Sequence, residues 1–125
     1  MNDVERFKFS FRNAKGGLLL AFRTQRNLRI HFIAAGFAIL LAPFLQVAMV
    51  EFLIILMTIL MVLATELINT AIEFSVDLIS PEFNHLAKKA KDVSAAAVLI
   101  AAIFAVIIGI LIYLPKVITL IANWL

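Results

Sequence analysis

Polar and apolar residues are mixed over the first part of the chain and separate into long blocks after it. In residues 3–24 apolar side chains recur at spacings of three and four, and most Arg and Lys side chains lie off this stripe. The stripe comprises Phe7, Phe11, Ala14, Leu18 and Ala21 with Phe22. This period is typical of an amphipathic helix. It predicts a surface helix over residues 3–24, with its apolar side on a membrane and its basic side toward anionic head groups.

Three long apolar blocks follow this helix. Residues 32–50 and 93–114 carry no charge, and the uncharged block 52–65 continues in a helical pattern. About 20 consecutive apolar residues are enough for a helix to cross a bilayer. The sequence therefore predicts an all-α membrane protein with three transmembrane helices. These spans are expected at about 30–50, 52–79 and 86–114.

Turn and helix-end residues set the limits of the predicted spans. Glu51 marks the turn after the first span. In Ser80-Pro81-Glu82 the second span should stop and the third helix restart, with Ser80 as its N-cap and Pro81 at its first position. Pro115-Lys116 predicts the end of the third span. The apolar tail that follows, with Trp124, is expected to lie at the membrane interface.

Composition and charge agree with one membrane-embedded domain. Hydrophobic residues make up 64% of the chain, whereas soluble domains are nearer half apolar. The absence of cysteine excludes a disulfide framework and a thiolate metal site. Seven of the eleven Lys and Arg residues precede residue 30, a pattern unlike a signal peptide. Because basic loops stay in the cytoplasm, we expect a multi-pass cell-membrane protein with its N-terminus cytoplasmic and its C-terminus outside. Lys116 alone departs from this rule.

One stripe of the second span carries polar groups that lipid does not favour. On a helix, Glu73 lies about 20° from Glu66, and Asp77 lies about 20° to the other side. Asn69 lies about 60° from Glu66. With a rise of about 1.5 Å per residue, Glu66 is about 21 Å and Glu73 about 31 Å from Phe52, and the hydrocarbon is about 30 Å thick. We therefore expect Glu66 inside the inner leaflet, Glu73 near the head groups and Asp77 beyond them.

Several explanations of this stripe are open. Glu66 and Asn69 could simply join helices through hydrogen bonds. A carboxylate inside the bilayer costs a few kcal/mol, so four polar groups on one stripe favour a functional site. Their like charges require a cation, either a lysine among residues 88–91 or Mg²⁺, which takes carboxylate and phosphate oxygens. A partly buried Glu66 suits a general base.

Two classes of function remain open from the residues alone. One is an enzyme that acts on a lipid head group, and the other is a non-enzymatic oligomeric ion or proton pathway. The carboxylates cluster at one end of the membrane, which favours the enzyme. Because no Gly-x-x-x-x-Gly-Lys loop is present, a nucleotide site is not of the P-loop kind. We interpret His31 and His85, each alone in a polar junction, as interfacial residues and not as metal ligands.

Two motifs carry a resemblance to a known family. They are Glu66-x-x-Asn-Thr-Ala-x-Glu73-x-x-x-Asp77 and Ala90-Lys-Asp-x-x-Ala-Ala-Ala-Val98. Together they resemble the small integral-membrane kinases of the prokaryotic diacylglycerol kinase family, and the same order of elements covers nearly the whole chain. The junction Arg26-Asn-Leu-Arg-Ile-His31 looks more like the Gram-positive branch, which prefers undecaprenol, than the Gram-negative branch, which uses diacylglycerol.

The resemblance implies a homotrimer that uses MgATP to phosphorylate a membrane lipid alcohol, at sites between subunits and without a nucleic-acid partner. By motif position, Glu66 matches the catalytic base and Glu73 a Mg²⁺ ligand. The positions that match nucleotide-contacting or polar active-site residues are Arg6, Asn13, Asn69, Asp77, Glu82, Asn84, Lys91 and Asp92. Gln25 stands where the family usually has a second metal-binding Glu. Its amide offers an oxygen but no charge, which puts this second ligand in doubt.

The family resemblance leaves the acceptor undetermined. Phosphorylation of undecaprenol to undecaprenyl phosphate is the expected reaction, and phosphorylation of diacylglycerol to phosphatidic acid is the alternative. Because the lipid-facing residues are generic apolar side chains, they do not distinguish the two lipids.

Overall fold

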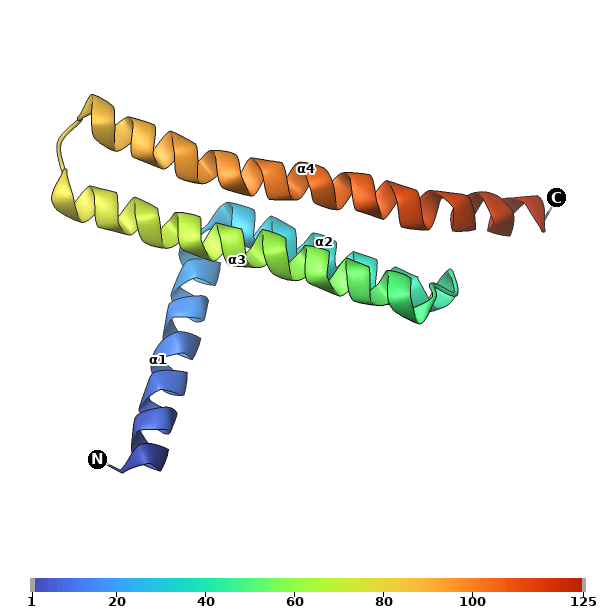
Figure 1. The fold of residues 1–125 in the computed structure, drawn as a ribbon, viewed down its shortest axis with the longest axis horizontal. Coiled ribbons are helices and arrows are strands. Elements are labelled where there is room, and N and C mark those ends of the chain that lie inside the picture. The colour runs from blue at the N-terminus through green and yellow to red at the C-terminus, as the bar shows by residue number, and fades with distance from the viewer. Residues whose placement is uncertain (1, 125) are drawn as a thin grey trace.

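The fold consists of four helices connected by short turns (Figure 1). A computed structural model describes residues 2–124. The helices are α1 (Asp3–Thr24), α2 (Arg26–Phe44), α3 (Met49–Ile79) and α4 (His85–Ala122), and the described residues contain no strand. Helices α2, α3 and α4 are each long and apolar enough to cross a membrane. The predicted all-α architecture with three spans is confirmed.

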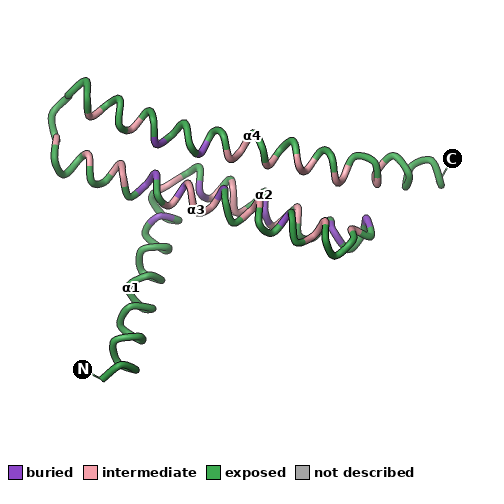
Figure 2. The backbone as a smooth tube through the Cα atoms, viewed as in Figure 1, coloured by how far each residue is buried: buried purple, intermediate pink, exposed green. Residues whose placement is uncertain are grey.

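Helix α1 projects away from the other three helices at a steep angle (Figure 1). It begins with a capping box: the Asn2 side chain accepts a hydrogen bond from the Glu5 backbone at 2.9 Å, and the Glu5 carboxylate accepts one from the Asn2 backbone at 3.0 Å. Ala21 is its one buried residue, so nearly the whole helix is exposed (Figure 2). The predicted helix over 3–24 is confirmed, and its position on a membrane surface stays a prediction.

The bend between α1 and α2 is fixed by a side chain. Gln25 is extended (φ −100°, ψ 111°) and separates the two helices. The Arg29 guanidinium donates to the backbone oxygens of Phe22 at 3.0 Å and Arg23 at 2.9 Å. These carbonyls belong to the last turn of α1 and have no partner within the helix. Arg29 therefore stabilises the end of α1 and the direction in which it leaves the bundle.

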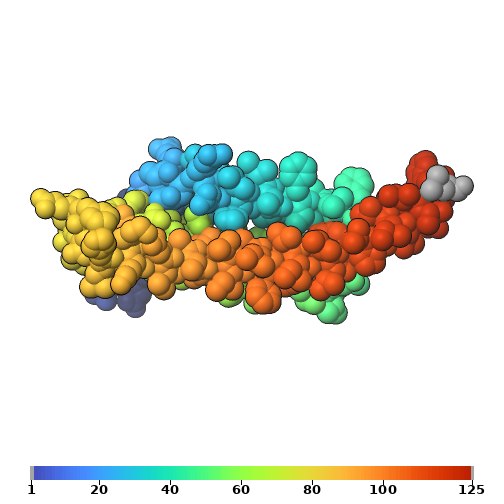
Figure 3. Space-filling view, turned by 90° about the horizontal axis from the view of Figure 1, so that it is seen from above, coloured from blue at the N-terminus to red at the C-terminus, as the bar shows by residue number. Residues whose placement is uncertain are grey.

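The three long helices lie side by side, with α3 in contact with both α2 and α4. Few side chains are fully buried; the apolar ones in this bundle include Leu28, Ile55, Val62 and Val98. Most large apolar side chains are exposed, on a scale that a water-soluble monomer rarely shows. Seen from above, α2 and α4 run along the bundle in the same general direction (Figure 3), and α3 makes the main helix contacts. Such an apolar surface is stable in contact with lipid or with other copies of the chain.

Two predicted helix limits are wrong. Helix α4 starts at His85, with the Asn84 side chain accepting from the Leu86 and Ala87 backbones, so Ser80 is not its N-cap. Helix α4 also continues through Pro115 to Ala122, although the sequence predicted its end there. Proline removes one backbone donor, but its fixed φ is compatible with a helix and the apolar sequence continues to Ala122, so this single residue does not end an apolar spanning helix.

The end of the bundle opposite the α3–α4 loop is joined by polar contacts. Lys116 of α4 forms an ion pair of 2.8 Å with Glu51 of α3, and Glu51 lies in the first helical turn and not in the turn before it. The Tyr113 hydroxyl donates to the Ala38 carbonyl of α2 at 2.6 Å. These contacts give Lys116, the exception to the charge rule, a partner within the protein.

Candidate active site

Glu66 is among the most deeply buried side chains of the described residues, at 2% exposed. It lies on α3, where the Thr70 hydroxyl donates to its backbone oxygen at 2.9 Å. The side-chain oxygen Oε2 is buried without a hydrogen-bond partner. A buried polar atom of this kind requires an explanation in a native protein. A group that arrives with the substrate is one such explanation.

Glu66 lines a partly open cavity of about 290 Å³ between α2, α3 and α4. The polar side chains around it come from two helices: Asn27 and His31 from α2, and Glu66, Asn69 and Glu73 from α3. Helix α4 contributes apolar residues, among them Val98 and Ala102. Three residues of the predicted stripe thus share one cavity, as the helical spacing predicted.

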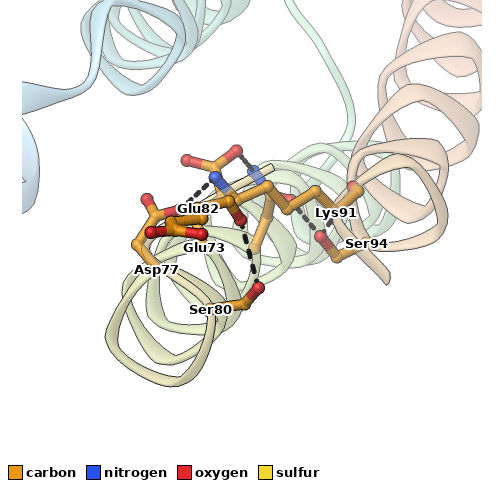
Figure 4. A network of polar contacts seen from close by, with 7 residues as sticks. Glu73, Asp77, Ser80, Glu82, Lys91 and Ser94 are labelled. Atoms are coloured by element: carbon orange, nitrogen blue, oxygen red, sulfur yellow. Dashed lines mark hydrogen bonds and ion pairs between the residues drawn. The ribbon is translucent and has the colours of Figure 1, made fainter. Parts of the chain in front are cut away.

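A chain of hydrogen bonds orients the polar stripe (Figure 4). The Ser94 hydroxyl of α4 donates to the Asn69 side-chain oxygen at 2.6 Å, and the Asn69 amide donates to Glu73 Oε1 at 3.1 Å. Ser94 also contacts the Lys91 backbone oxygen at 2.9 Å. Asn69 and Ser94 are buried, whereas Glu73 is half-buried. The α3–α4 contact therefore sets the direction of the Glu73 carboxylate.

Beyond the cavity, charged pairs cover the ends of α3 and α4. Lys91 of α4 forms an ion pair with Asp77 of α3, which Figure 4 shows next to Glu73. Lys88 pairs with Asp92 one turn away on α4. The lysine side chain of the first pair is 36% exposed and both groups of the second are 60% exposed. These cations lie where water, and a nucleotide dissolved in it, can reach them.

The loop between α3 and α4 holds two more predicted residues. Asn84 is the N-cap of α4, so its side-chain oxygen is already engaged. Glu82 is exposed, and its backbone oxygen accepts from the Ser80 hydroxyl at 3.2 Å. The Glu82 carboxylate makes no ion pair among the described residues. The loop thus stands at the same end of the bundle as the Asp77–Lys91 pair.

Three other predicted residues do not line the Glu66 cavity. Arg6 and Asn13 lie on the exposed part of α1, and Gln25 forms the α1–α2 junction. Since α1 rises about 1.5 Å per residue, Arg6 stands about 27 Å along the helix from Thr24 at its junction end. Within one chain, the structure does not bring Arg6 to the Glu66 cavity.

A magnesium ion would find few protein ligands here. No group of three or more acidic, His or Cys side chains in the described residues could hold a metal. One carboxylate oxygen of Glu73 accepts a hydrogen bond from the Asn69 amide. The other oxygen accepts none from residues 2–124. Mg²⁺ commonly binds one or two carboxylates and completes its shell with phosphate oxygens and water. The residues present therefore fit a metal that arrives with a nucleotide.

Asn27, His31 and Ser94 belong to the site but were not predicted. His31 was interpreted as an interfacial residue; its half-buried side chain lines the cavity of Glu66, and its position relative to the membrane interface stays a prediction. His85, in contrast, is exposed and packs edge-on against Phe83 at 5.0 Å. The four-residue spacing of Asn27 and His31 places both on one helix face, a signal that could have indicated the cavity.

A second, apolar cavity of about 280 Å³ adjoins the first. It also lies between α2, α3 and α4, and small residues line much of it, among them Ala34, Ala38, Ala105 and Gly109. His31 and Ala102 line both cavities. The site therefore combines a polar chamber with an apolar one.

Known proteins with similar sequences identify the family to which this chain belongs. The sequence profile named "Prokaryotic diacylglycerol kinase" matches residues 12–113. The chain belongs to the prokaryotic diacylglycerol kinase family. Among this family's members, it is 44% identical over 116 residues to the undecaprenol kinase of Bacillus subtilis, covering 92% of this chain and 94% of that protein.

Other relatives in the family carry a different name. The diacylglycerol kinase of Synechocystis is 43% identical over 112 residues, which are 89% of this chain and 64% of that protein. The diacylglycerol kinase of Escherichia coli K12 is 36% identical over 91 residues, which are 73% of this chain and 75% of that protein. Membership makes the chain a membrane-embedded lipid kinase with ATP as phosphoryl donor. The enzyme class is confirmed over the non-enzymatic ion or proton pathway.

Proposed function

We propose that this kinase transfers the γ-phosphoryl group of MgATP to the hydroxyl of undecaprenol. The observation that carries the proposal is the buried, unpaired Oε2 of Glu66, a residue that lines a cavity between three helices long and apolar enough to span a membrane. A lipid alcohol reaches such a cavity from the bilayer, and its hydroxyl proton supplies the partner that Oε2 lacks. Glu66 then acts as the general base.

Undecaprenol is favoured as acceptor by two observations. The relative named undecaprenol kinase is matched over nearly the full length of both chains. The junction Arg26–His31 also resembles the Gram-positive branch of the family. Diacylglycerol is the second candidate, because the Synechocystis diacylglycerol kinase is almost as similar over the aligned residues.

The nucleotide is proposed to approach from water at the α3–α4 loop. Lys91 offers a cation to the phosphates, Asp77 and Asp92 hold the lysines of this region in ion pairs, and the loop with Glu82 and Asn84 flanks them. Phosphoryl transfer depends mainly on positioning and on neutralising phosphate charge. Solvent-accessible cations close to the Glu73 carboxylate, which Asn69 orients, suit this task.

Glu73 is the proposed metal ligand, with Gln25 as a weaker candidate. Glu73 is half-buried and oriented by Asn69, so one oxygen can point toward a metal–nucleotide complex. Bound Mg²⁺ would neutralise phosphate charge and fix the nucleotide in place. Gln25 is half-buried at the α1–α2 junction and does not line the Glu66 cavity. Its side-chain oxygen would therefore bind Mg²⁺ only if the bound nucleotide held the ion close to this junction.

A trimer with sites shared between subunits is proposed for the working enzyme. Its support is the exposed α1, which carries Arg6 and Asn13 away from the Glu66 cavity of its own chain. On a neighbouring copy these side chains could complete the nucleotide site. The basic α1 would lie on the cytoplasmic surface, with the C-terminus of α4 outside.

The test is ATP consumption by the purified protein in detergent micelles that contain either undecaprenol or diacylglycerol. We expect turnover with both, and a higher kcat/KM for undecaprenol. Glu66→Gln in the same micelles controls for contaminating ATPases. A higher kcat/KM for diacylglycerol would reverse the choice of acceptor, and no turnover with either lipid would contradict the proposed reaction.

A further inference from the structure

His31 lies at the boundary between the polar and the apolar cavity. It is on the second turn of α2, its side chain is half-buried, and it lines both chambers. Ala102 is the other residue shared by the two linings, and it has no polar side-chain atom. A molecule that extended from one chamber into the other would therefore pass the imidazole.

The imidazole has no partner within the described chain. No hydrogen bond or ion pair joins His31 to any of residues 2–124, whereas its helix neighbour Arg29 donates from one guanidinium nitrogen to two carbonyls at the end of α1. Glu66 Oε2, in the same cavity, is also unpaired. The other charged side chain of the lining is Glu73, which has Asn69 as a partner. Two unpaired polar groups on facing helices thus border one chamber.

A lipid alcohol matches these two chambers in shape and polarity. Its apolar chain suits the Ala-rich and Gly-containing chamber, and its single hydroxyl suits the polar one. A neutral imidazole offers one N–H donor and one acceptor, whereas an ionised carboxylate only accepts. The hydroxyl can give its proton to Glu66 and accept a hydrogen bond from His31 with an oxygen lone pair.

We propose that His31 binds the hydroxyl of the lipid acceptor and holds it against Glu66. This inference rests on the proposed lipid-alcohol kinase reaction. It assigns His31 to the acceptor and not to ATP, because His31 lines the apolar chamber as well as the Glu66 cavity, whereas Glu73 lines only the Glu66 cavity. Its contribution is orientation, since Glu66 remains the group that takes the proton.

The test compares His31→Leu, which keeps a similar volume without a donor, with His31→Gln, which keeps an N–H donor. Steady-state kinetics in micelles give kcat and separate KM values for undecaprenol and for ATP. We expect His31→Leu to lower kcat/KM for undecaprenol by about tenfold, the loss typical of one hydrogen bond, with KM for ATP unchanged. His31→Gln should recover part of this loss, and His85→Gln, which removes the exposed histidine, should match the wild type.

Each outcome separates the two proposals. A wild-type enzyme that phosphorylates no lipid alcohol overturns the proposed function. An active wild type with unchanged undecaprenol kinetics in His31→Leu overturns the assignment of His31 alone. An equal rise in KM for ATP in His31→Leu also overturns it, because the imidazole would then serve the nucleotide.

Discussion

The hydroxyl of Ser94 on α4 donates a 2.6 Å hydrogen bond to the side-chain oxygen of Asn69 on α3, and both side chains are buried. Because that oxygen is engaged, the Asn69 amide group turns toward Glu73, to which it donates at 3.1 Å. Helix α4 thereby orients a carboxylate that it does not itself carry. This coupling connects helix packing to the chemistry of the site.

Ser94→Ala should destabilise the protein and lower its activity. Removal of the hydroxyl leaves the buried Asn69 oxygen without this donor, which costs about 1 kcal/mol in a membrane protein. Thermal unfolding in micelles and kcat measure the two effects. The matched control is Ser75→Ala, whose exposed hydroxyl contacts only the Ala71 carbonyl of its own helix. Equal behaviour of the two variants would contradict the coupling.

Glu66→Gln should abolish turnover and leave the fold intact. The amide preserves the volume of the side chain but cannot accept the hydroxyl proton, and general base catalysis is worth about 10²- to 10⁴-fold. Lipid phosphorylation measures kcat, while ATP binding and thermal unfolding report on structure. Near-normal kcat in the purified variant would remove Glu66 from the role of base.

Glu73→Gln should raise the Mg²⁺ concentration required for half-maximal activity. The amide keeps an oxygen and the geometry of the Asn69 contact, but it loses the charge that a hard cation prefers. A Mg²⁺ titration at saturating ATP measures the shift. Gln25→Glu, which adds the carboxylate usual in the family, should change the titration in the opposite direction. An unchanged Mg²⁺ titration in Glu73→Gln would argue against ligation at this residue.

The helices were predictable because their signals are long and repeated. Twenty or so apolar residues define each span, and the spacing of Glu66, Asn69 and Glu73 fixes a common helix face whatever the neighbours are. Signals carried by single residues predicted the helix ends less well. Ser80 and Pro115 fit the rules for helix ends, yet Asn84 caps α4 and the helix runs through the proline, because the preference of a single residue is a weak signal of where a helix ends.

The parts of the site that depend on contacts between helices could not be predicted from one sequence. His31 looks like any polar residue at the edge of a span until α2 packs against α3 and turns it toward Glu66. Ser94 is likewise one small residue in an Ala-rich stretch, and only the α3–α4 packing brings it to Asn69. Such pairs are far apart in sequence, and periodicity carries no information about them.

The Asp77–Lys91 pair allows a test of what Lys91 does. An ion pair this exposed contributes only about 0–1 kcal/mol to stability, so Lys91→Met should barely change thermal unfolding. If Lys91 binds nucleotide phosphate, KM for ATP should rise about tenfold or more, since hydrogen bonds to charged groups are the stronger ones. The swapped variant Asp77→Lys with Lys91→Asp restores the pair but not the position of the cation. Full activity of the swap would show that the pair is only structural.

The opposite end of the bundle should affect stability without affecting the nucleotide. Lys116 and Glu51 form the one ion pair between α3 and α4 at that end of residues 2–124, and Glu51 also accepts a hydrogen bond from the Ala48 backbone at 2.9 Å. Lys116→Met should lower the thermal midpoint in micelles and leave KM for ATP unchanged, because the whole width of the membrane separates it from Asp77 and Lys91. Glu51→Gln should lower the midpoint further, since it weakens both the pair and the start of α3. A changed KM for ATP in either variant would show that the two ends are coupled through α4.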